Sequence, residues 1–334
     1  MRRVTDTHED GIIAVFVVLL MLGLLGVAGL VVDFGIVRAE KRELQNGADA
    51  AALALAQDCA MNLLCTNVAK ADTYADANAT DNAASIVNVT MPSAGRVKVD
   101  TRTATRLGAT SLATKFANLV GGPSSVTVNA TATAGWGAPS GAQTIPLTIS
   151  YCEWNTLTGG GTTFNIPQTI YFHNPTANQN ANNAPPCSGG PAGQNLPGGF
   201  GWLDTISNTI CGTAITTGGW YGSAPGNSPP NTNNSGCTPS LFMSTPILIP
   251  VFQEVQSQGQ NGQYRIYGLA TFQITRMRLG GNGSQWTTSP PPPNCSSSQR
   301  CIYGSFTQTI IPWTGGTPNS TGPNLGTLSV FLTA

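Results

Sequence analysis

The residues with the clearest chemistry in this chain are its cysteines. All of them lie in the part of the sequence that follows a long apolar run near the N-terminus. An even number of cysteines is typical of disulfides formed in an oxidising compartment. A zinc site would need Cys-x-x-Cys pairs or interspersed histidines, and the sequence has no such pair and only two histidines, so no metal is expected. The eight disulfide candidates are Cys59, Cys65, Cys152, Cys187, Cys211, Cys237, Cys295 and Cys301.

Spacing alone does not settle how these cysteines pair, because eight cysteines allow about 105 pairings. Two short loops are the most economical closures, Cys59/Cys65 and Cys295/Cys301. The weaker suggestions are Cys211/Cys237 and Cys152/Cys187. Short loops stabilise a fold least in the chain-entropy account, so we expect them mainly to shape turns.

Groups suited to catalysis are sparse. Beyond residue 110 the acids are Glu153, Asp204 and Glu254, and the one histidine there is His173. General acid–base chemistry requires titratable groups in a shared pocket, and these are spread over about a hundred residues. A Gly-x-Ser-x-Gly nucleophile motif is also missing. We therefore expect no enzyme and no cofactor, although a cluster of these four residues in the fold would favour an enzyme.

The charge balance argues against nucleic acid as a partner. Fifteen basic and fifteen acidic residues give a net charge of about zero, so no field steers the chain to phosphates. Aromatic residues could instead stack on a carbohydrate, although burial in a core is the commoner reason for such residues. The aromatic candidates are Trp154, Trp202, Trp220, Tyr221, Trp286 and Trp313.

The elements that carry these residues begin with an apolar run. Residues 12–32 contain no charge and are long enough to cross ~30 Å of hydrocarbon as a helix. A cleaved signal peptide is the alternative, but its apolar region would be about 7–15 residues. Basic residues on both sides of the run leave orientation undecided. The cysteines favour residues 1–11 in the cytoplasm and the rest outside, on a single-pass anchor in the cell membrane.

The helix is expected to continue beyond the bilayer as a stalk, residues 33–57, because no proline interrupts it before about Gln57. Arg38, Arg42, Gln45 and Asp49 form one polar stripe, and Leu44, Ala48, Ala51, Ala52 and Leu55 lie on the other side. The alanines either simply favour helix or let a second helix approach closely. Asp49 is either a solvated acid or a partner for a basic group on a neighbouring helix.

Two further regions complete a predicted α+β fold. Residues 58–137 are expected to form a small α+β module with helices near 67–84 and 109–120 and strands near 86–91, 96–105 and 125–134. In the second helix, Leu112, Phe116 and Leu119 would pack on the small sheet. Residues 138–334 alternate apolar positions between turn-rich segments, which predicts a disulfide-containing, mainly antiparallel β domain. Disorder is the alternative there.

The N-terminal region resembles a known family. The apolar run is followed by Asp33-Phe34-Gly35 and then by "LQNGADAAAL", and this pattern is similar to the TadE/TadG-like proteins of Tad (Flp-type) pilus assembly, in its actinobacterial form. The matching positions are Asp33, Gly35, Leu44, Gln45, Asp49, Ala51, Ala52 and Leu53. The resemblance implies a membrane-anchored, pilin-like component whose N-terminal helix packs laterally, with the lipid bilayer and other Tad or pilin-like subunits as partners.

Two family features are missing. Counting from Gly11, the glutamate of a type IV prepilin cleavage site would fall at Phe16, so processing as an ordinary prepilin is not implied. Some larger members carry a von Willebrand A-type metal site with Asp-x-Ser-x-Ser, and "DTIS" at 204–207 does not fit it.

Three functions remain open on these grounds. The first is a structural or assembly component of a Tad-type apparatus. The second is an adhesin-like surface module that binds an unknown ligand on the same anchor. The third, less favoured, is an anchored extracytoplasmic enzyme.

Overall fold

The computed structural model describes residues 10–61, 63–172, 191, 198–226, 228–230, 236–243, 245–256, 261–280, 284–311 and 322–333. The chain divides into two compact units. Unit 1 comprises Met1–Gly135 and Leu332–Ala334, and unit 2 comprises Trp136–Phe331. The helix that was expected to be a separate stalk and the small α+β module therefore fall into one unit.

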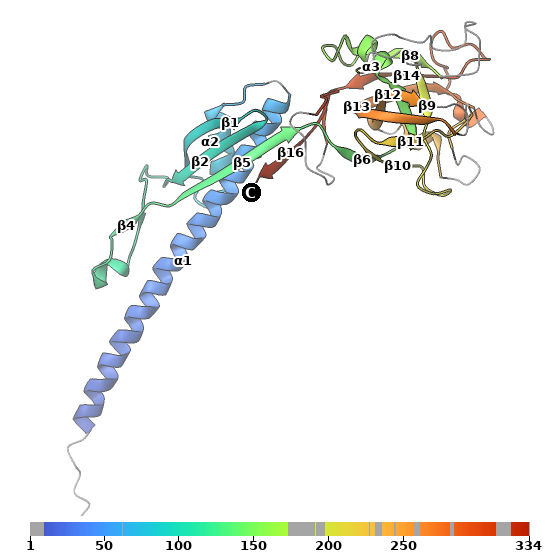
Figure 1. Cartoon of the computed structure of the whole chain (residues 1–334). Helices are drawn as coiled ribbons and strands as arrows, with labels where there is room; N and C mark the ends of the chain where they lie inside the picture. The colour runs from blue at the N-terminus through green and yellow to red at the C-terminus, as the bar shows by residue number, and fades with distance from the viewer. Residues whose placement is uncertain are drawn as a thin grey trace, which may run out of the picture. The chain divides into compact units, whose positions relative to one another are not determined.

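Helix α1 (Asp10–Ala60) is a single uninterrupted helix, drawn in blue in Figure 1. Its sequence contains no proline and is dominated by leucine, valine and alanine, so no residue removes a backbone donor along its length. At 1.5 Å per residue it is about 75 Å long. The predicted continuation of the apolar segment into one long helix is confirmed.

The C-terminal part of α1 packs on α2 (Val68–Ala77) and on an antiparallel sheet of β1 (Ala84–Ser93), β2 (Arg96–Thr103) and β5 (Asn129–Gly137). The side chain of Asn67 caps α2 by accepting a hydrogen bond from the Lys70 backbone N–H at 3.0 Å. Along β2 every second residue is buried, as expected for a strand with one covered face. The chain end also joins unit 1, because Thr333 Oγ1 donates to the Thr133 carbonyl at 3.1 Å.

The predicted helix at 109–120 is wrong. The segment between β2 and β5, residues 104–128, contains β3 (Leu112–Ala113), a single 3₁₀ turn η1 (Ala117–Val120) and β4 (Ser125–Val126). We call this segment the β2–β5 loop. Its threonines, serines and glycines have low helix propensity, and an isolated helix of this length is marginal. Leu119 does not pack on the sheet but is 79% exposed.

Unit 2 is built on a sheet in the order β8-β14-β13-β12-β7-β9, with β11 also paired to β13. The pairs are antiparallel except β7 with β12, which confirms a mainly antiparallel domain. The strands are β8 (Gln168–Tyr171), β14 (Cys301–Thr307), β13 (Gln263–Arg278), β12 (Ile247–Gln256), β7 (Leu147–Ser150), β9 (Phe200–Trp202) and β11 (Trp220–Gly222).

The remaining elements do not belong to this sheet. Strands β6 and β10 form a separate antiparallel pair, and β15 runs parallel to the start of β16. The elements are β6 (Gly141–Thr144), β10 (Thr213–Thr216), β15 (Thr309–Ile311), β16 (Thr327–Thr333), the helices α3 (Tyr151–Thr158) and α4 (Pro239–Met243), and the 3₁₀ turn η4 (Ser284–Trp286).

Aromatic rings hold the core of unit 2 together. Phe200, Trp202, Phe242 and Trp286 make successive edge-to-face contacts with centroids 5.7–6.0 Å apart. Trp154 is buried in the same core, so three of the candidate carbohydrate-stacking residues are core residues. Trp220 is exposed, Tyr221 is half-buried, and Trp313 lies outside the described residues.

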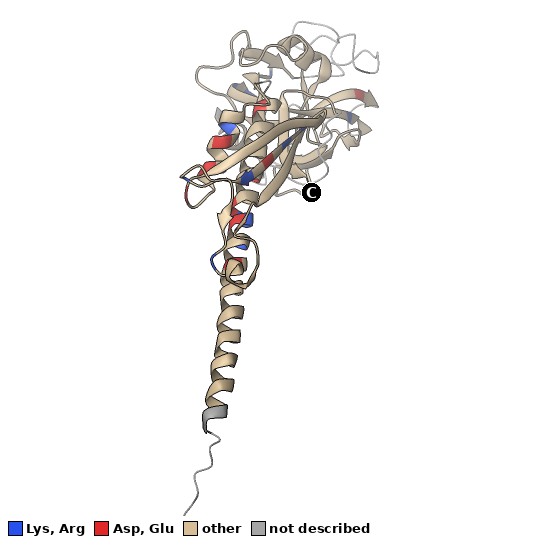
Figure 2. Cartoon of the chain, turned by 90° about the vertical axis from the view of Figure 1, so that its left-hand side faces the viewer, with Lys and Arg blue, Asp and Glu red and all other residues tan. Residues whose placement is uncertain are grey.

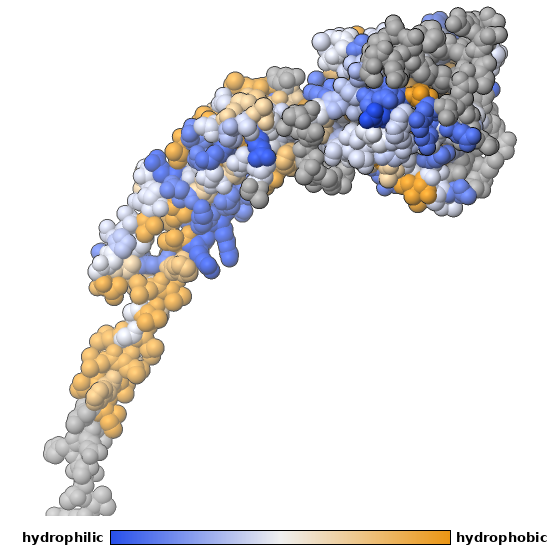
Figure 3. All heavy atoms as spheres, in the orientation of Figure 1, coloured by the Kyte–Doolittle hydropathy of each residue, from blue (hydrophilic) through white to orange (hydrophobic). Residues whose placement is uncertain are grey.

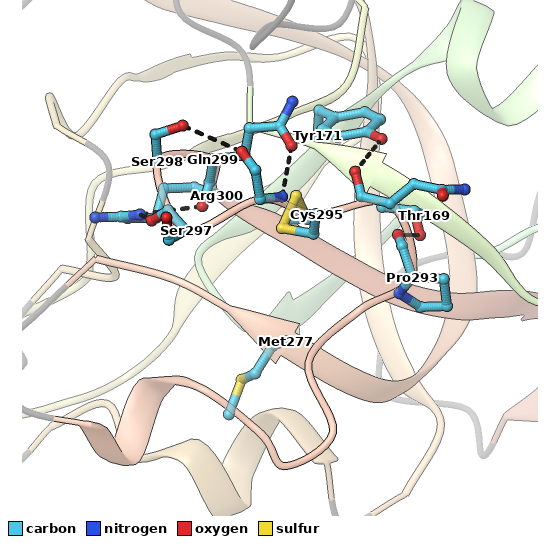
Figure 4. The surroundings of a disulfide bond; sticks show 12 residues. Thr169, Tyr171, Met277, Pro293, Cys295, Ser297, Ser298, Gln299 and Arg300 are labelled. Atoms are coloured by element: carbon cyan, nitrogen blue, oxygen red, sulfur yellow. Dashed lines mark hydrogen bonds between the residues drawn. A yellow bond between two sulfur atoms is a disulfide. The ribbon is translucent and has the colours of Figure 1, made fainter.

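The structure contains the disulfides Cys59–Cys65, Cys211–Cys237 and Cys295–Cys301. Cys152 is also disulfide-bonded, and its suggested partner Cys187 lies outside the described residues. Around Cys295, the neighbouring backbone is fastened to β8, since Thr169 Oγ1 donates to the Pro293 carbonyl at 2.8 Å and the Tyr171 hydroxyl donates to the Asn294 carbonyl at 2.9 Å (Figure 4). The short loop closed by the Cys295–Cys301 disulfide is thus a turn held against strand β8.

Candidate functional site

The N-terminal half of α1 presents apolar side chains to its surroundings. The large side chains from Ile13 to Val32 are exposed, and Figure 3 shows the resulting apolar surface. By length and composition the helix can cross a membrane. No charged residue occurs between Gly11 and Val32. Together these features indicate a membrane-anchored protein.

The C-terminal half of α1 is the core of unit 1. Leu44, Ala48, Ala51, Ala52 and Leu55 are buried. A second helix does approach the small residues, but it is α2 of the same chain: a Cβ on Gly47 would lie 3.1 Å from the Ala75 backbone. Within the chain, α2 and the sheet cover these alanines, and their packing against a helix of another subunit stays a prediction.

Polar side chains of the helix bind the backbone of β5. Gln45 Nε2 donates to Asp49 Oδ1 at 2.9 Å and to the Thr131 carbonyl at 3.0 Å, and Lys41 Nζ donates to the Asn129 carbonyl. Asp49 therefore orients a glutamine that links α1 to the sheet within the chain. Leu53 is half-buried, and nothing in the structure explains a glycine at position 35, around which space is open.

Asp33 lies where the two halves of α1 meet, and its carboxylate binds the β2–β5 loop. Oδ1 accepts the Lys115 N–H at 2.9 Å, and Oδ2 accepts the N–H groups of Phe116 and Ala117 at 2.8 and 2.6 Å. Asp33 is only 5% exposed. These hydrogen bonds are charge-assisted, and such bonds are stronger than those between neutral groups. The family-like Asp33 thus fastens a loop from more than eighty residues away to the helix.

One turn before Asp33, the ring of Phe116 covers Gly29. A Cβ at Gly29 would lie 2.6 Å from the Phe116 ring, so only glycine permits this packing. The sequence did not single out Gly29, and it predicted that Phe116 would pack on the small sheet rather than on α1. The one available signal was the length of the segment between β2 and β5, since connections longer than about 12–15 residues are commonly functional.

Basic groups follow immediately after this junction. Three basic residues of α1 are exposed: Arg38, Lys41 and Arg42. The Arg38 guanidinium lies 5.1 Å from the centroid of the Phe34 ring. Figure 2 shows charged residues on the part of α1 that packs on the sheet and none on the described part of its N-terminal half. Basic and aromatic side chains in this position are typical of a membrane–water interface.

The acids of unit 2 each have a separate local environment. Glu153 accepts the Gly199 N–H at 2.9 Å, and burial raises the pKa of its carboxyl, partly offset by that hydrogen bond. Glu254 pairs with Arg265 at 2.8 Å, Asp204 lies beside Gly222, and His173 is outside the described residues. Within the described ranges, no group of His, Cys, Asp or Glu could hold a metal ion.

A shallow hollow in unit 2 is lined by polar and apolar groups, among them Ser140, Gln253 and Tyr267, and by no charged side chain. Among its described lining residues, Tyr267 is the only titratable side chain. Of the described tryptophans Trp220 alone is exposed, and a single ring does not form an aromatic platform for a carbohydrate.

The architecture defines a class of protein. It is a membrane-anchored protein in which the second half of the anchoring helix forms part of the core of a folded α+β unit. Residues 11–58 match the model of the Tad family, described as putative Flp pilus-assembly TadE/G-like. The match covers nearly all of α1, including Asp33 and the buried alanines. No curated protein and no solved structure matches the chain.

Proposed function

We propose that this protein is a membrane-anchored, pilin-like structural component of a Tad (Flp-type) pilus-assembly apparatus. One observation carries the proposal: the segment that matches the family coincides with a helix that is apolar and exposed in one half and enclosed by an α+β unit in the other. Such a helix can anchor a head and leave a side open to neighbouring subunits.

The exposed N-terminal half of α1 is the surface that we expect to meet both lipid and other subunits. The buried face at Ala51 and Ala52 is unavailable while unit 1 is folded. Unit 2, with its disulfides, belongs in an oxidising compartment. We therefore place the N-terminus in the cytoplasm and both units outside it.

The test is photo-crosslinking in the native host. Benzoylphenylalanine would replace Leu22 or Leu25, which are exposed on the N-terminal half of α1, and as a matched control Val87, which is exposed on β1. We expect crosslinks from the helix positions to Tad pilus-assembly or pilin-like subunits, and none of these from Val87. Absence of any pilus component at both helix positions would contradict the proposal.

A further inference from the structure

The β2–β5 loop carries large apolar side chains that no described part of the chain covers. Leu119 and Val120, in the turn η1 at its tip, are 79% and 62% exposed, and Phe116 beside them is 41% exposed. Leaving several such groups in water is unfavourable, because each would gain by burial. An exposed apolar cluster of this kind marks an interaction surface.

The contacts of the loop with α1 fix its level along the helix. Asp33 binds the backbone of residues 115–117, and Phe116 packs on Gly29. Gly29 belongs to the uncharged run and lies about 4.5 Å before Val32 along the helix axis. Figure 1 shows η1 and β4 projecting from the sheet alongside α1, toward its N-terminal half. The tip of the loop is therefore level with the end of the membrane-spanning segment.

We propose that the β2–β5 loop is a second membrane contact, with Leu119 and Val120 at its tip inserted at the boundary between headgroups and acyl chains of the bilayer that α1 crosses. The apolar surface of the loop is continuous with the apolar surface of the helix at Gly29. This inference rests on the membrane anchoring of α1, which is part of the proposed function, and not on the pilus partners.

The backbone of the loop suits an interfacial depth. Irregular backbone is not tolerated against hydrocarbon unless its polar groups are bonded, whereas apolar groups can enter the headgroup boundary by about 5–10 Å. The Thr114 N–H donates to the Ser124 carbonyl at 3.0 Å and the Gly122 N–H to the Ala117 carbonyl at 2.8 Å. Asp33 accepts three more N–H groups at the tip, so much of the backbone at the tip is bonded within the protein.

The charges also suit a lipid surface. The loop contains no acid, and Arg106 and Lys115 are exposed beside its apolar residues. On α1, Arg38 and Arg42 are exposed just beyond the junction. Basic groups near the surface attract anionic headgroups, while the carboxylate of Asp33 is enclosed by the loop.

The experiment measures depth in the full-length protein in bilayer nanodiscs of phosphatidylglycerol and phosphatidylcholine. An environment-sensitive fluorescent amino acid would replace Leu119, with Leu25 as the reference within the span and Val87 as the reference on the head. Lipids with a nitroxide near the headgroup quench fluorophores at the boundary, and lipids with a nitroxide deep in the acyl chain quench the reference fluorophore at Leu25. We expect a large loss of fluorescence at Leu119 and little loss at Val87.

A matched pair of glycine variants tests whether docking on α1 sets this depth. Gly29→Leu would collide with the Phe116 ring, whereas the space around Gly26 is open, so Gly26→Leu is the control. We expect Gly29→Leu to reduce quenching at Leu119 and Gly26→Leu to leave it unchanged. Asp33→Asn, which weakens acceptance of the loop N–H groups without adding bulk, should act in the same direction.

The possible outcomes separate this inference from the proposed function. Quenching at Leu25 with none at Leu119 overturns the membrane-contact loop but leaves the anchor. Loss of quenching at both positions removes the anchor and with it the inference. Benzoylphenylalanine at Leu119 that crosslinks to a protein subunit in the native host, and not to lipid, would assign the loop to a subunit interface and also overturn the inference.

Discussion

The two halves of α1 belong to one continuous helix but have opposite surroundings. From Ile13 to Val32 bulky side chains point outward on all sides, whereas from Leu44 to Ala60 most positions are buried beneath α2 and the sheet. Side-chain size follows this division: leucine and valine dominate the first half, and alanine dominates the second. Small residues are needed where another element lies close to the helix, as Ala75 does at Gly47.

The comparison teaches that helix propensity and burial are separate properties of this sequence. Alanine favours helix in either environment, but Ala48, Ala51, Ala52 and Ala56 of the second half are also fully buried. Asp33 lies between the exposed apolar half of α1 and the buried part that starts at Leu44, and the β2–β5 loop is attached at Asp33.

The largest expected effect comes from shortening a buried leucine in the second half. Leu55 has no exposed surface, so Leu55→Ala should lower the free energy of unfolding of unit 1 by about 2–5 kcal/mol. Leu22 is 60% exposed, and Leu22→Ala should change it by less than about 0.5 kcal/mol. Denaturant unfolding of the detergent-solubilised full chain measures both. Equal effects at the two positions would show that the two halves of α1 do not differ in burial.

Enlarging a small residue should give a somewhat smaller difference. Ala51→Leu places extra volume in a fully packed position and should destabilise unit 1 by about 1–3 kcal/mol. Gly26→Leu in the first half meets open space, and it should leave the unfolding midpoint unchanged or raise it slightly because leucine favours helix. A tolerated leucine at position 51 would mean that the alanine face is open after all.

At the junction we expect a local effect. Asp33→Ala removes the acceptor for three backbone N–H groups and should accelerate hydrogen exchange of the amides at Lys115, Phe116 and Ala117. Asp49→Ala is the control, since its carboxylate accepts from Gln45 and does not touch the loop. Hydrogen exchange with mass spectrometry distinguishes the two variants. Unchanged exchange in Asp33→Ala would show that the loop is held by Phe116 alone.

The smallest expected effect concerns a carboxyl in unit 2, which provides a contrast to Asp33. Because burial raises the pKa of Glu153, its folded form keeps a proton at pH values where the unfolded chain has lost it. Unit 2 should therefore lose stability as pH rises from about 4.3, the ordinary glutamate value, through the higher folded pKa. Glu153→Gln keeps an acceptor for Gly199 and should flatten this dependence.

The measurement is the unfolding midpoint of unit 2 between pH 4 and 7 in the wild type and in Glu153→Gln. Asp204→Asn serves as a control for removing one acid from the same unit. A pH dependence that is identical in the wild type and in Glu153→Gln would show that the carboxyl at 153 does not contribute.

Much of the architecture was predictable because it depends on local sequence. The apolar run and the absence of proline predicted one helix through residue 57. The strands predicted near 86–91 and 96–105, the second from its alternating valines, correspond to β1 and β2. Short spacing also pointed to the pairs Cys59–Cys65 and Cys295–Cys301, which the structure contains. The helix predicted at 109–120 failed because three apolar residues at helical spacing lie among weak helix formers whose backbone N–H groups bind Asp33.

The sequence by itself determined helix α1, its apolar first half and the similarity of that segment to a family. These features follow from the length, periodicity and composition of a continuous stretch of chain. Only the tertiary structure decided what covers the alanine face, why Asp33 follows the apolar run and where the β2–β5 loop lies. These features depend on contacts between residues that are far apart in sequence, such as Gly29 with Phe116 and Asp33 with Lys115. No local sequence pattern predicts such a contact, because the sequence around each residue is compatible with many different contact partners.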